Sequence, residues 1–199
     1  MPPILVLSTR NAKKRKEIEE ILGDLGLTLH DLSQYPEAPE VVEDGVTFEA
    51  NARKKATETA IAIGQWVLGE DSGLVVPALK GAPGVYSARY AGKQGDDAAN
   101  NQKLLAELAP LPVEKREAYY ICTAALADPK GHIHAVVEGR CWGRIIAEQR
   151  GQGGFGYDPY FLVPEYHQTF GELSARVKHA LSHRGRALLQ LRPELRRQS

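Results

Sequence analysis

The order in which the apolar patterns change along the chain is the feature that most constrains its fold. Residues 4–7 form a short run of branched apolar side chains, which predicts a buried strand. From Asn11 the apolar residues recur at helical spacing, and residues 27–32 predict a second strand. A long helix is expected over residues 47–63, because Thr47 can cap its N-terminus. Strand and helix therefore alternate at the start of the chain, as they do in α/β proteins.

The pattern changes to strands in the second half of the chain. Residues 119–126 and 132–137 are rich in β-forming residues and are joined by ADPKG, which favours a hairpin turn. Further elements are expected as helices around 97–108, 172–181 and 184–195 and as strands at 142–146 and 160–163. The sequence therefore predicts a single mixed α/β domain over residues 1–199, in which a hairpin lobe faces an α/β lobe across a cleft.

The charge balance and the cysteines narrow the functional classes. The chain carries 25 acidic and 25 basic residues, so its formal net charge is zero, which argues against a nucleic acid polymer or a membrane surface as partner. Cys122 and Cys141 lie in apolar runs without CxxC spacing, and we interpret them as buried thiols of a reducing compartment. Neither a signal peptide nor an apolar stretch of membrane-spanning length is visible, so we expect a cytoplasmic protein.

The stretch STRNAKKRKE, residues 8–17, suggests an anion site. A strand is expected to pass here through a polar turn into a helix whose first turn holds Lys13 and Lys14. Basic side chains are unfavourable at this end of a helix, which already carries partial positive charge. A bound phosphate would offset that cost, with Thr9, Asn11 and the first backbone N–H groups of the helix as hydrogen-bond donors. The alternative is an ordinary solvated helix face.

The stretch VEDGVTFEANARKKA, residues 42–56, places Glu43 and Asp44 in a loop just before the long helix. On that helix Asn51 and Lys55 share one face, because they are four residues apart. Carboxylate oxygens next to a phosphate site would suit magnesium, which takes few protein carboxylates and keeps several waters. Helix capping and pairing with the helix dipole explain the two acids without any function, and this alternative stays open.

The stretch GEDSGL, residues 69–74, places Glu70 and Asp71 together between two expected strands, at 66–68 and 74–79. Adjacent carboxylates repel one another, and a loop gains no packing from them. Ligands of open α/β folds bind at the carboxyl ends of strands, so Asp71 is a candidate for binding magnesium and activating an attacking water. The alternative is a turn in which Asp71 and Ser72 cap a bend.

The stretch GGFGYDP, residues 153–159, is a glycine-rich loop with two aromatic side chains. Glycines let a backbone approach a ligand closely. Phe155 or Tyr157 could stack on a base while Asp158 accepts a hydrogen bond from a base N–H group. The alternative is a hairpin loop whose aromatic rings turn into the core.

The stretch SHRG, residues 182–185, brings a histidine and an arginine together shortly after Lys178. Arg184 can fork onto an oxygen-bearing edge of a ligand, and His183 can donate beside it. The alternative is a helix N-cap at Ser182 followed by two ordinary surface residues.

Together these stretches resemble one family. STRNAKK, EDGVTFEANA, EDSGL, GAPGVYSARYAG, GGFGYDP and SHRGRAL follow the order of the motifs of the inosine triphosphate pyrophosphatases, which act on non-standard purine nucleotides. The resemblance extends over residues 5–189, nearly the whole chain, and the later motifs are specific in combination. It implies an elongated, two-lobed α/β fold with a mixed sheet and a central nucleotide-binding cleft, usually as a homodimer.

The resemblance also implies an activity and a set of site residues. The expected reaction is hydrolysis of inosine, deoxyinosine and xanthosine triphosphates to the monophosphate and pyrophosphate, with Mg²⁺ as cofactor. Glu43 and Asp71 match the metal-associated carboxylates, and Asp71 matches the catalytic base. The positions that match substrate contacts are Thr9, Arg10, Asn11, Ala12, Lys13, Lys14, Lys55, Ser72, Phe155, Gly156, Tyr157, Asp158, Lys178, His183 and Arg184.

The base pocket is expected to prefer a 6-oxo purine. Donors on His183 and Arg184 fit the O6 atom, whereas the 6-amino group of adenine would leave them unpaired at a cost of about 1–3 kcal/mol. Two alternatives are a pyrophosphatase for other modified or pyrimidine nucleotides and a nucleotide-binding module without activity. Glu43, Asp71 and Lys14 argue against the second, because a pure binder needs no water-activating acid.

The chain departs from the usual motifs at three positions. Arg10 stands where the first motif usually has glycine, and Ala50 stands where many members have an acid. Val177 precedes Lys178 where a glutamate is usual, which could alter how Lys178 is held. None of these changes removes a proposed catalytic group.

Overall fold

The computed structural model describes residues 4–197, and within them the chain divides into two compact units. Unit 1 comprises the residues up to Asp71, the segment Cys122–Gly139 and the residues from Arg184 onward. Unit 2 comprises Ser72–Ile121 and Arg140–His183. No helix among residues 4–197 combines the length and the apolarity needed to cross a bilayer. Both cysteines are buried thiols, as expected.

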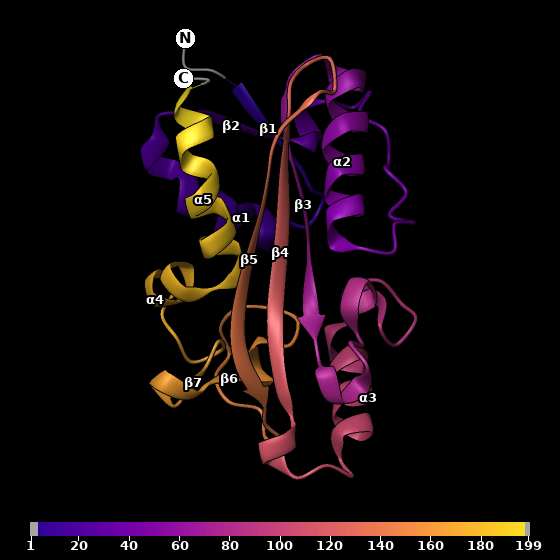
Figure 1. The fold of residues 1–199 in the computed structure, drawn as a ribbon, viewed down its shortest axis with the longest axis vertical. Coiled ribbons are helices and arrows are strands. Elements are labelled where there is room, and N and C mark those ends of the chain that lie inside the picture. The colour runs from indigo at the N-terminus through magenta and orange to yellow at the C-terminus, as the bar shows by residue number, and fades with distance from the viewer. Residues whose placement is uncertain (1–3, 198–199) are drawn as a thin grey trace. The chain divides into compact units, whose positions relative to one another are not determined.

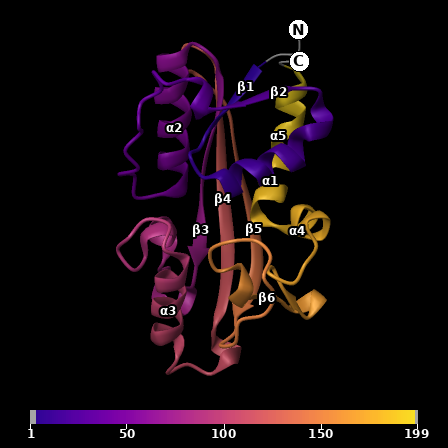
Figure 2. The same ribbon diagram turned by 180° about the vertical axis from the view of Figure 1, so that it is seen from behind.

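A mixed sheet of seven strands, counted over the described residues, runs in the order β2-β1-β3-β4-β5-β6-β7. The strands are β1 (Ile4–Ser8), β2 (Thr28–Asp31), β3 (Trp66–Val75), β4 (Glu117–Ala127), β5 (Ile133–Ile145), β6 (Phe161–Val163) and β7 (Gln168–Thr169). The helices are α1 (Ala12–Leu22), α2 (Phe48–Ile63), α3 (Asp97–Leu108), α4 (Ala175–Leu181) and α5 (His183–Arg197) (Figures 1 and 2). β1 is parallel to β2 and β3, whereas β6 is antiparallel to β5 and β7. The expected mixed α/β class is confirmed.

In unit 1 the strand residues alternate between two apolar layers. Leu5, Leu7 and Leu68 face a core that they form with α1 and α5. Val6 and Val67 face the opposite way, toward α2. Figure 1 shows α2 on one side of these strands and α1 with α5 on the other. Because successive side chains of a strand point to opposite faces, the position of a residue in β3 decides which helices it meets.

Unit 2 is built around one apolar cluster in which aromatic rings meet. The ring of Tyr120 on β4 lies 4.7 Å from that of Phe161 and 5.6 Å from that of Phe170, measured between centroids. Leu104 and Leu108 of α3 are fully buried in the same cluster. This packing anchors α3, whose polar residues contact the glycine-rich loop described below.

β3 departs from the expectation of two strands separated by a loop. It runs unbroken over Trp66–Val75 and carries GEDSGL within it, so the turn alternative for Asp71 and Ser72 is wrong. Each carboxylate meets cations on its own face, and the extended backbone therefore needs no turn to accommodate them. The strand ends before Pro77, which lacks an N–H group for the sheet and opens a 3-10 turn at Pro77–Leu79.

Two further boundaries differ from the sequence-based expectation. The helix expected from residue 172 begins at Ala175, where the Ser174 side chain caps it by accepting from the Val177 N–H group. The strand expected at residues 142–146 is the end of the longer strand β5. The hairpin predicted from ADPKG is confirmed as the connection between β4 and β5.

Candidate active site

The start of α1 is organised by its own side chains. Asn11 caps the helix, and its Oδ1 accepts from the N–H groups of Lys13 (3.0 Å) and Lys14 (3.1 Å). Thr9 Oγ1 in turn accepts from the Asn11 N–H group (3.1 Å). The first turn holds no acidic residue, so positive charge gathers at this end of the helix. The other members of the predicted phosphate segment, Arg10 and Ala12, are exposed.

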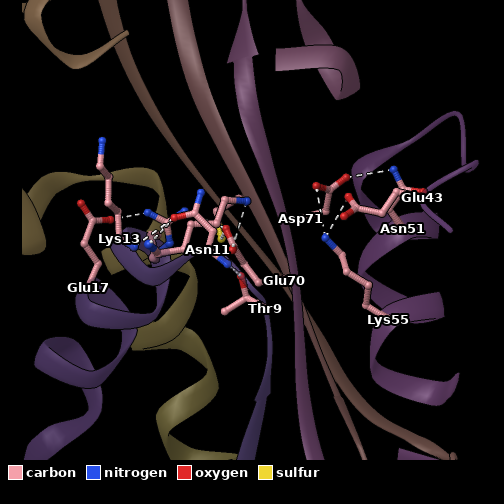
Figure 3. Close-up of polar contacts among 12 residues, drawn as sticks. Thr9, Asn11, Lys13, Glu17, Glu43, Asn51, Lys55, Glu70 and Asp71 are labelled. Carbon is pink, nitrogen blue, oxygen red and sulfur yellow. Dashed lines mark hydrogen bonds and ion pairs between the residues drawn. The ribbon is translucent and has the colours of Figure 1, made fainter. Parts of the chain in front are cut away.

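Glu70 is a buried carboxylate that the sequence left without a role. Arg184 Nη2 lies 2.9 Å from Glu70 Oε1, while Arg184 Nη1 donates to Glu17 on α1. Lys14 Nζ lies 3.4 Å from Glu70 Oε2, and the Cys122 thiol donates to Oε1 (3.4 Å). Figure 3 shows Glu70 on the α1 side of β3. Lys14 and Arg184, two predicted substrate contacts, are therefore held by the same buried carboxylate.

Burial and charge act in opposite directions on the arginine of this group. Burial tends to lower the pKa of Arg184, but the charges of Glu70 and Glu17 outweigh it and raise the pKa. Burial, followed by the charge of Glu70, raises the pKa of the Cys122 thiol well above its usual range. The arginine is therefore a cation and the thiol stays protonated at neutral pH.

Asp71 lies on the other side of β3, against α2 (Figure 3). Asn51 Nδ2 donates to Asp71 Oδ2 (3.0 Å), and Lys55 Nζ lies 3.6 Å from Asp71 Oδ1. Asn51 and Lys55 thus share the helix face that their spacing predicted. Gly69 permits the close approach of β3 to α2, because a Cβ at this position would lie 2.4 Å from the carbonyl oxygen of Ala52.

The surroundings of Asp71 make it a stronger base than an ordinary aspartate. Burial raises its pKa, although the charges of Lys55 and Lys14 act to lower it. Burial also tends to lower the pKa of Lys55, but the charges of Asp71, Glu43 and Glu70 outweigh that effect and raise it. A carboxylate with a raised pKa beside a persistent cation accepts a proton more readily than an ordinary aspartate does.

Glu43 and Asp71 both contact the amino group of Lys55. Glu43 Oε2 lies 3.0 Å from Lys55 Nζ, on the same side of β3 as Asp71. Residues 4–197 contain no group of three or more His, Cys, Asp or Glu side chains arranged to hold a metal ion. Two carboxylates without a histidine or cysteine still suit Mg²⁺, which binds through one or two carboxylates together with phosphate oxygens and waters. The neighbouring Asp44 pairs instead with Lys54 (2.6 Å).

The glycine-rich loop of unit 2 is held by a buried ion pair. Lys178 Nζ lies 2.7 Å from Asp158 Oδ2, which also accepts from the Phe155 N–H group (2.8 Å). Lys178 Nζ lies 5.1 Å from the centre of the half-buried Phe155 ring. Tyr157 is buried and its hydroxyl donates to the Ser87 carbonyl (2.8 Å), so its ring takes the core position that the sequence left open.

The remaining predicted contacts lie around the junction of α4 and α5 and within β3. His183 is buried in unit 2 and stacks on Tyr120, with ring centroids 4.7 Å apart. Ser182 separates α4 from α5, and its N–H group donates to the Lys178 carbonyl (2.8 Å). Ser72 follows Asp71 in β3 and is partly buried.

Three residues with contacts to the predicted segments escape prediction from sequence: Glu17, which pairs with Arg184, and Asp97 and Asn101 of α3, which both bond to the backbone of Gly156. Glu17 lies three residues after Lys14 on α1, and Asp97 and Asn101 are four residues apart on α3. These spacings place each set on one helix face, which was visible in the sequence. Their partners come from distant segments, however, and no local pattern identifies those.

Comparison of the sequence with known proteins finds one family and close relatives within it. It matches the Ham1 family over residues 5–194. It is 56% identical over 193 residues to the dITP/XTP pyrophosphatase of Rhodopirellula baltica, covering 97% of this chain and 93% of that protein. It is 52% identical over 184 residues to the dITP/XTP pyrophosphatase of Desulforamulus reducens, covering 92% and 91%.

Solved structures agree with these sequence matches. The HAM1 protein of Coxiella burnetii superposes with a TM-score of 0.87 at 39% identity, covering 97% of this chain and 98% of that one. A nucleoside-triphosphatase, or dITP/XTP pyrophosphatase, of Mycobacterium abscessus gives a TM-score of 0.76 at 44% identity, covering 96% and 99%. The resemblance read from the motifs is confirmed, and the chain belongs to the Ham1 family.

Proposed function

We propose that this protein hydrolyses non-standard purine nucleoside triphosphates, namely dITP, ITP and XTP, to the monophosphate and pyrophosphate. The observation that carries the proposal is the buried Asp71, whose carboxylate is held by Asn51 and Lys55 and whose pKa is raised. It lies in a chain about half identical, over nearly its whole length, to two dITP/XTP pyrophosphatases. This reaction removes inosine and xanthosine nucleotides from the pool of nucleoside triphosphates.

In the proposed mechanism Asp71 accepts a proton from a water molecule as that water attacks the α-phosphorus. The bond between the α-phosphorus and its bridging oxygen breaks, and pyrophosphate leaves. Lys14 and Lys55 stabilise the charge that gathers on the departing pyrophosphate. Glu43 and Asp71 would hold Mg²⁺, whose chemistry here is to neutralise phosphate charge. The capped start of α1, with Thr9 and Asn11, supports phosphate binding because it fixes backbone N–H groups beside two lysines.

Base recognition is proposed for the residues of the two later motifs. Phe155, with one flank of its backbone held by Asp158, offers a ring on which a purine can stack. His183 and Arg184 are proposed to donate toward the purine O6 atom, which adenine replaces with an amino group. Glu17 and Glu70 hold the two terminal nitrogens of Arg184 and so fix the plane of its guanidinium. Lys178 is proposed to keep Asp158 ionised and in place.

The protein is further proposed to be a cytoplasmic homodimer. Trp142 of unit 2 is 48% exposed and packs on Tyr119, with ring centroids 4.5 Å apart. An aromatic pair that remains half exposed is a surface that a second copy could cover. Light scattering coupled to size exclusion gives the test, since Trp142→Asp should shift a dimer toward the monomer. A wild-type protein that elutes as a monomer at all concentrations would remove this part of the proposal.

The activity is tested by pyrophosphate release, measured as phosphate after addition of inorganic pyrophosphatase. The panel consists of inosine, xanthosine, guanosine, adenosine and thymidine triphosphates, each with Mg²⁺. Rapid release from the inosine and xanthosine substrates, with adenosine and thymidine triphosphates far slower, is the expected result. Binding of inosine triphosphate without release of pyrophosphate would instead identify a nucleotide-binding module.

A further inference from the structure

We propose that Asp97 and Asn101 of α3 are positioning residues for purine recognition, because together they clamp Gly156 and so fix Phe155. This inference rests on the proposed function and deepens it, since it adds two residues that act on the nucleobase through another segment. Neither residue belongs to the motifs that carry the family resemblance. Both lie in unit 2, as do all their partners named here.

Asp97 and Asn101 together bond to both backbone polar groups of Gly156. Asp97 Oδ2 accepts from the Gly156 N–H group (3.0 Å), and Asn101 Nδ2 donates to the Gly156 carbonyl (2.8 Å). Asn101 Nδ2 also donates to the backbone carbonyl of Asp97 (2.8 Å), which holds the amide in place on the helix. Because the two residues are four apart, they present one face of α3 to the loop.

The loop needs such a restraint because its own sequence leaves it loose. Residues 151–156 read GQGGFG, and Gly156 adopts a left-handed conformation with φ of 62°. Glycines lose more backbone entropy on ordering than other residues, so a segment rich in them stays mobile unless external bonds hold it. The bonds from α3 are of this kind.

Phe155 lies between two restrained peptide groups. Its own N–H group donates to Asp158 Oδ2 (2.8 Å), which the buried Lys178 also contacts. The next peptide group along the chain is the one whose N–H group donates to Asp97. The backbone is therefore fixed on both sides of the aromatic residue proposed to stack on the base. Loss of one side would leave the ring attached but free to move away from the base.

The chemistry of Asn101 fits a clamp better than ordinary core packing. The residue is 8% exposed, and both partners of its Nδ2 are carbonyl oxygens, so this point needs a donor with two N–H bonds, which the amide of asparagine supplies without charge. Over the described residues, Asn101 Oδ1 has no hydrogen-bond partner. A buried amide costs stability unless its hydrogen bonds offset it. Leu104 and Leu108, one and two turns further along α3, are buried in the apolar cluster, whereas Asn101, also buried, donates to carbonyl oxygens of the backbone.

The test compares Asp97→Ala and Asn101→Ala with Asp96→Ala. Asp96 is the matched control, because it is the neighbouring carboxylate and caps α3 through its bond from the Ala99 N–H group (3.1 Å). Removing that cap weakens the same helix but leaves Asp97 and Asn101 in place. Asn101→Asp is a fourth variant of nearly unchanged size, in which an acceptor replaces the donor that faces two carbonyl oxygens. Circular dichroism and thermal melting establish that each variant is folded.

Binding of the two reaction products separates base recognition from phosphate recognition. Affinities for inosine monophosphate and for pyrophosphate are measured by calorimetry, and hydrogen exchange of peptides covering residues 153–158 reports the loop. Loss of Asp97 or Asn101 should weaken the binding of inosine monophosphate by about five- to tenfold, which corresponds to one hydrogen bond. The same variants should show faster hydrogen exchange in the loop. Asn101→Asp should weaken the binding of inosine monophosphate at least as much. The affinity for pyrophosphate should stay within about twofold of the wild-type value in all variants, and Asp96→Ala should leave both affinities unchanged.

Two outcomes in the variants would overturn the clamp. One is an equal loss of pyrophosphate and inosine monophosphate affinity in Asp97→Ala, which would show a general structural effect. The other is faster exchange in the loop with unchanged affinity for inosine monophosphate, which would show that the loop does not hold the base. Failure of the proposed function has a different signature, because a wild-type protein that binds inosine monophosphate without releasing pyrophosphate from triphosphates still permits the comparison. A wild-type protein that binds no inosine monophosphate would overturn the clamp, whether or not that protein releases pyrophosphate from inosine triphosphate.

Discussion

Glu70 and Asp71 are consecutive residues of β3, yet their carboxylates lie on opposite faces of the strand (Figure 3). Glu70 meets Lys14 and Arg184, whereas Asp71 meets Asn51 and Lys55. The alternation of side chains along a strand produces this separation. Two carboxylates that would repel one another in a loop are thereby given separate cations, and they can serve separate roles.

Asp71→Asn tests the role of the proposed base. The amide keeps the size of the side chain but cannot accept a proton from water, so pyrophosphate release from inosine triphosphate should fall by about two orders of magnitude or more. The measurement is kcat under saturating substrate, with circular dichroism as the control for folding. A folded variant with nearly normal turnover would show that Asp71 is not the base.

Glu70→Gln should act on stability first. Its side chain is 1% exposed and its charge is matched by a cation at each oxygen, so the substitution removes a carboxylate that pairs with Arg184 and leaves the pair with Glu17. Removing one member of a buried ion pair typically costs about 3–5 kcal/mol, and the remaining pair with Glu17 should keep the loss toward the low end. Urea unfolding measures the difference. An unchanged free energy of unfolding would show that the buried charge of Glu70 contributes nothing.

The pH dependence of activity should report the titration of Asp71. The base must be ionised to act, so kcat/KM should fall as the pH drops through its pKa, which burial raises and which Mg²⁺ bound beside it would lower. Lys55 lowers the pKa of Asp71 by its charge, so Lys55→Ala should move this acid limb of the profile to higher pH. If the acid limb of Lys55→Ala stays at the wild-type pH, whatever the loss in rate, then the group that titrates is not Asp71.

The same raised pKa sets the sign of the stability effect. A carboxyl whose folded pKa lies above its unfolded value contributes stability that is fully present below the unfolded pKa. That stability is lost as the pH rises through the folded pKa. At neutral pH, Asp71→Asn should therefore be at least as stable as the wild type. A loss of activity in this variant can then be assigned to the missing base and not to unfolding.

The fold could be read from the sequence where one pattern decides one element. The cap at Thr47, the helix face of Asn51 and Lys55, and the hairpin at ADPKG were all visible as local spacing, and the structure confirms them. The pattern wrongly predicts a break in β3, because adjacent Glu70 and Asp71 are typical of a loop. What keeps them in a strand is a set of cations on helices α1, α2 and α5, which no local pattern supplies.

The site was predicted as a list of residues but not as networks. Arg184 reads in the sequence as a surface donor, and the structure buries it between Glu17 and Glu70. The partner Glu17 lies 167 positions away in the chain, so the pairing depends entirely on how α1 and α5 pack on the same face of the sheet. Tertiary packing of this kind lies beyond periodicity and motif spacing.

Removal of the metal tests the roles of Glu43 and Asp71 as carboxylate ligands. Activity should disappear in the presence of excess EDTA and return on addition of Mg²⁺, because two carboxylates with phosphates and waters make a site for this ion. Glu43→Gln should raise the Mg²⁺ concentration needed for half-maximal rate while leaving the fold intact. Full activity after exhaustive chelation would assign both carboxylates to holding Lys55 alone.

Arg184 and Lys14 share Glu70 but are proposed to contact different parts of the nucleotide, and selectivity separates them. Lys14→Ala should lower kcat/KM for every triphosphate by a similar factor, because the phosphates are the same whatever the base. Loss of the planar donor at position 184 should cost inosine triphosphate more than adenosine triphosphate, by about 1.5–3 kcal/mol for a hydrogen bond from a charged group.

Two variants of Arg184 are needed, because its burial makes simple truncation hazardous. Arg184→Ala leaves the buried Glu70 and the partly buried Glu17 without a shared cation and should lower stability. Arg184→Lys keeps a positive charge between them but loses the forked, planar donor set. The ratio of kcat/KM for inosine and adenosine triphosphates should therefore fall in Arg184→Lys while the protein remains folded. If that ratio stays at the wild-type value, Arg184 serves the buried carboxylates and the reading of the purine edge belongs to other donors.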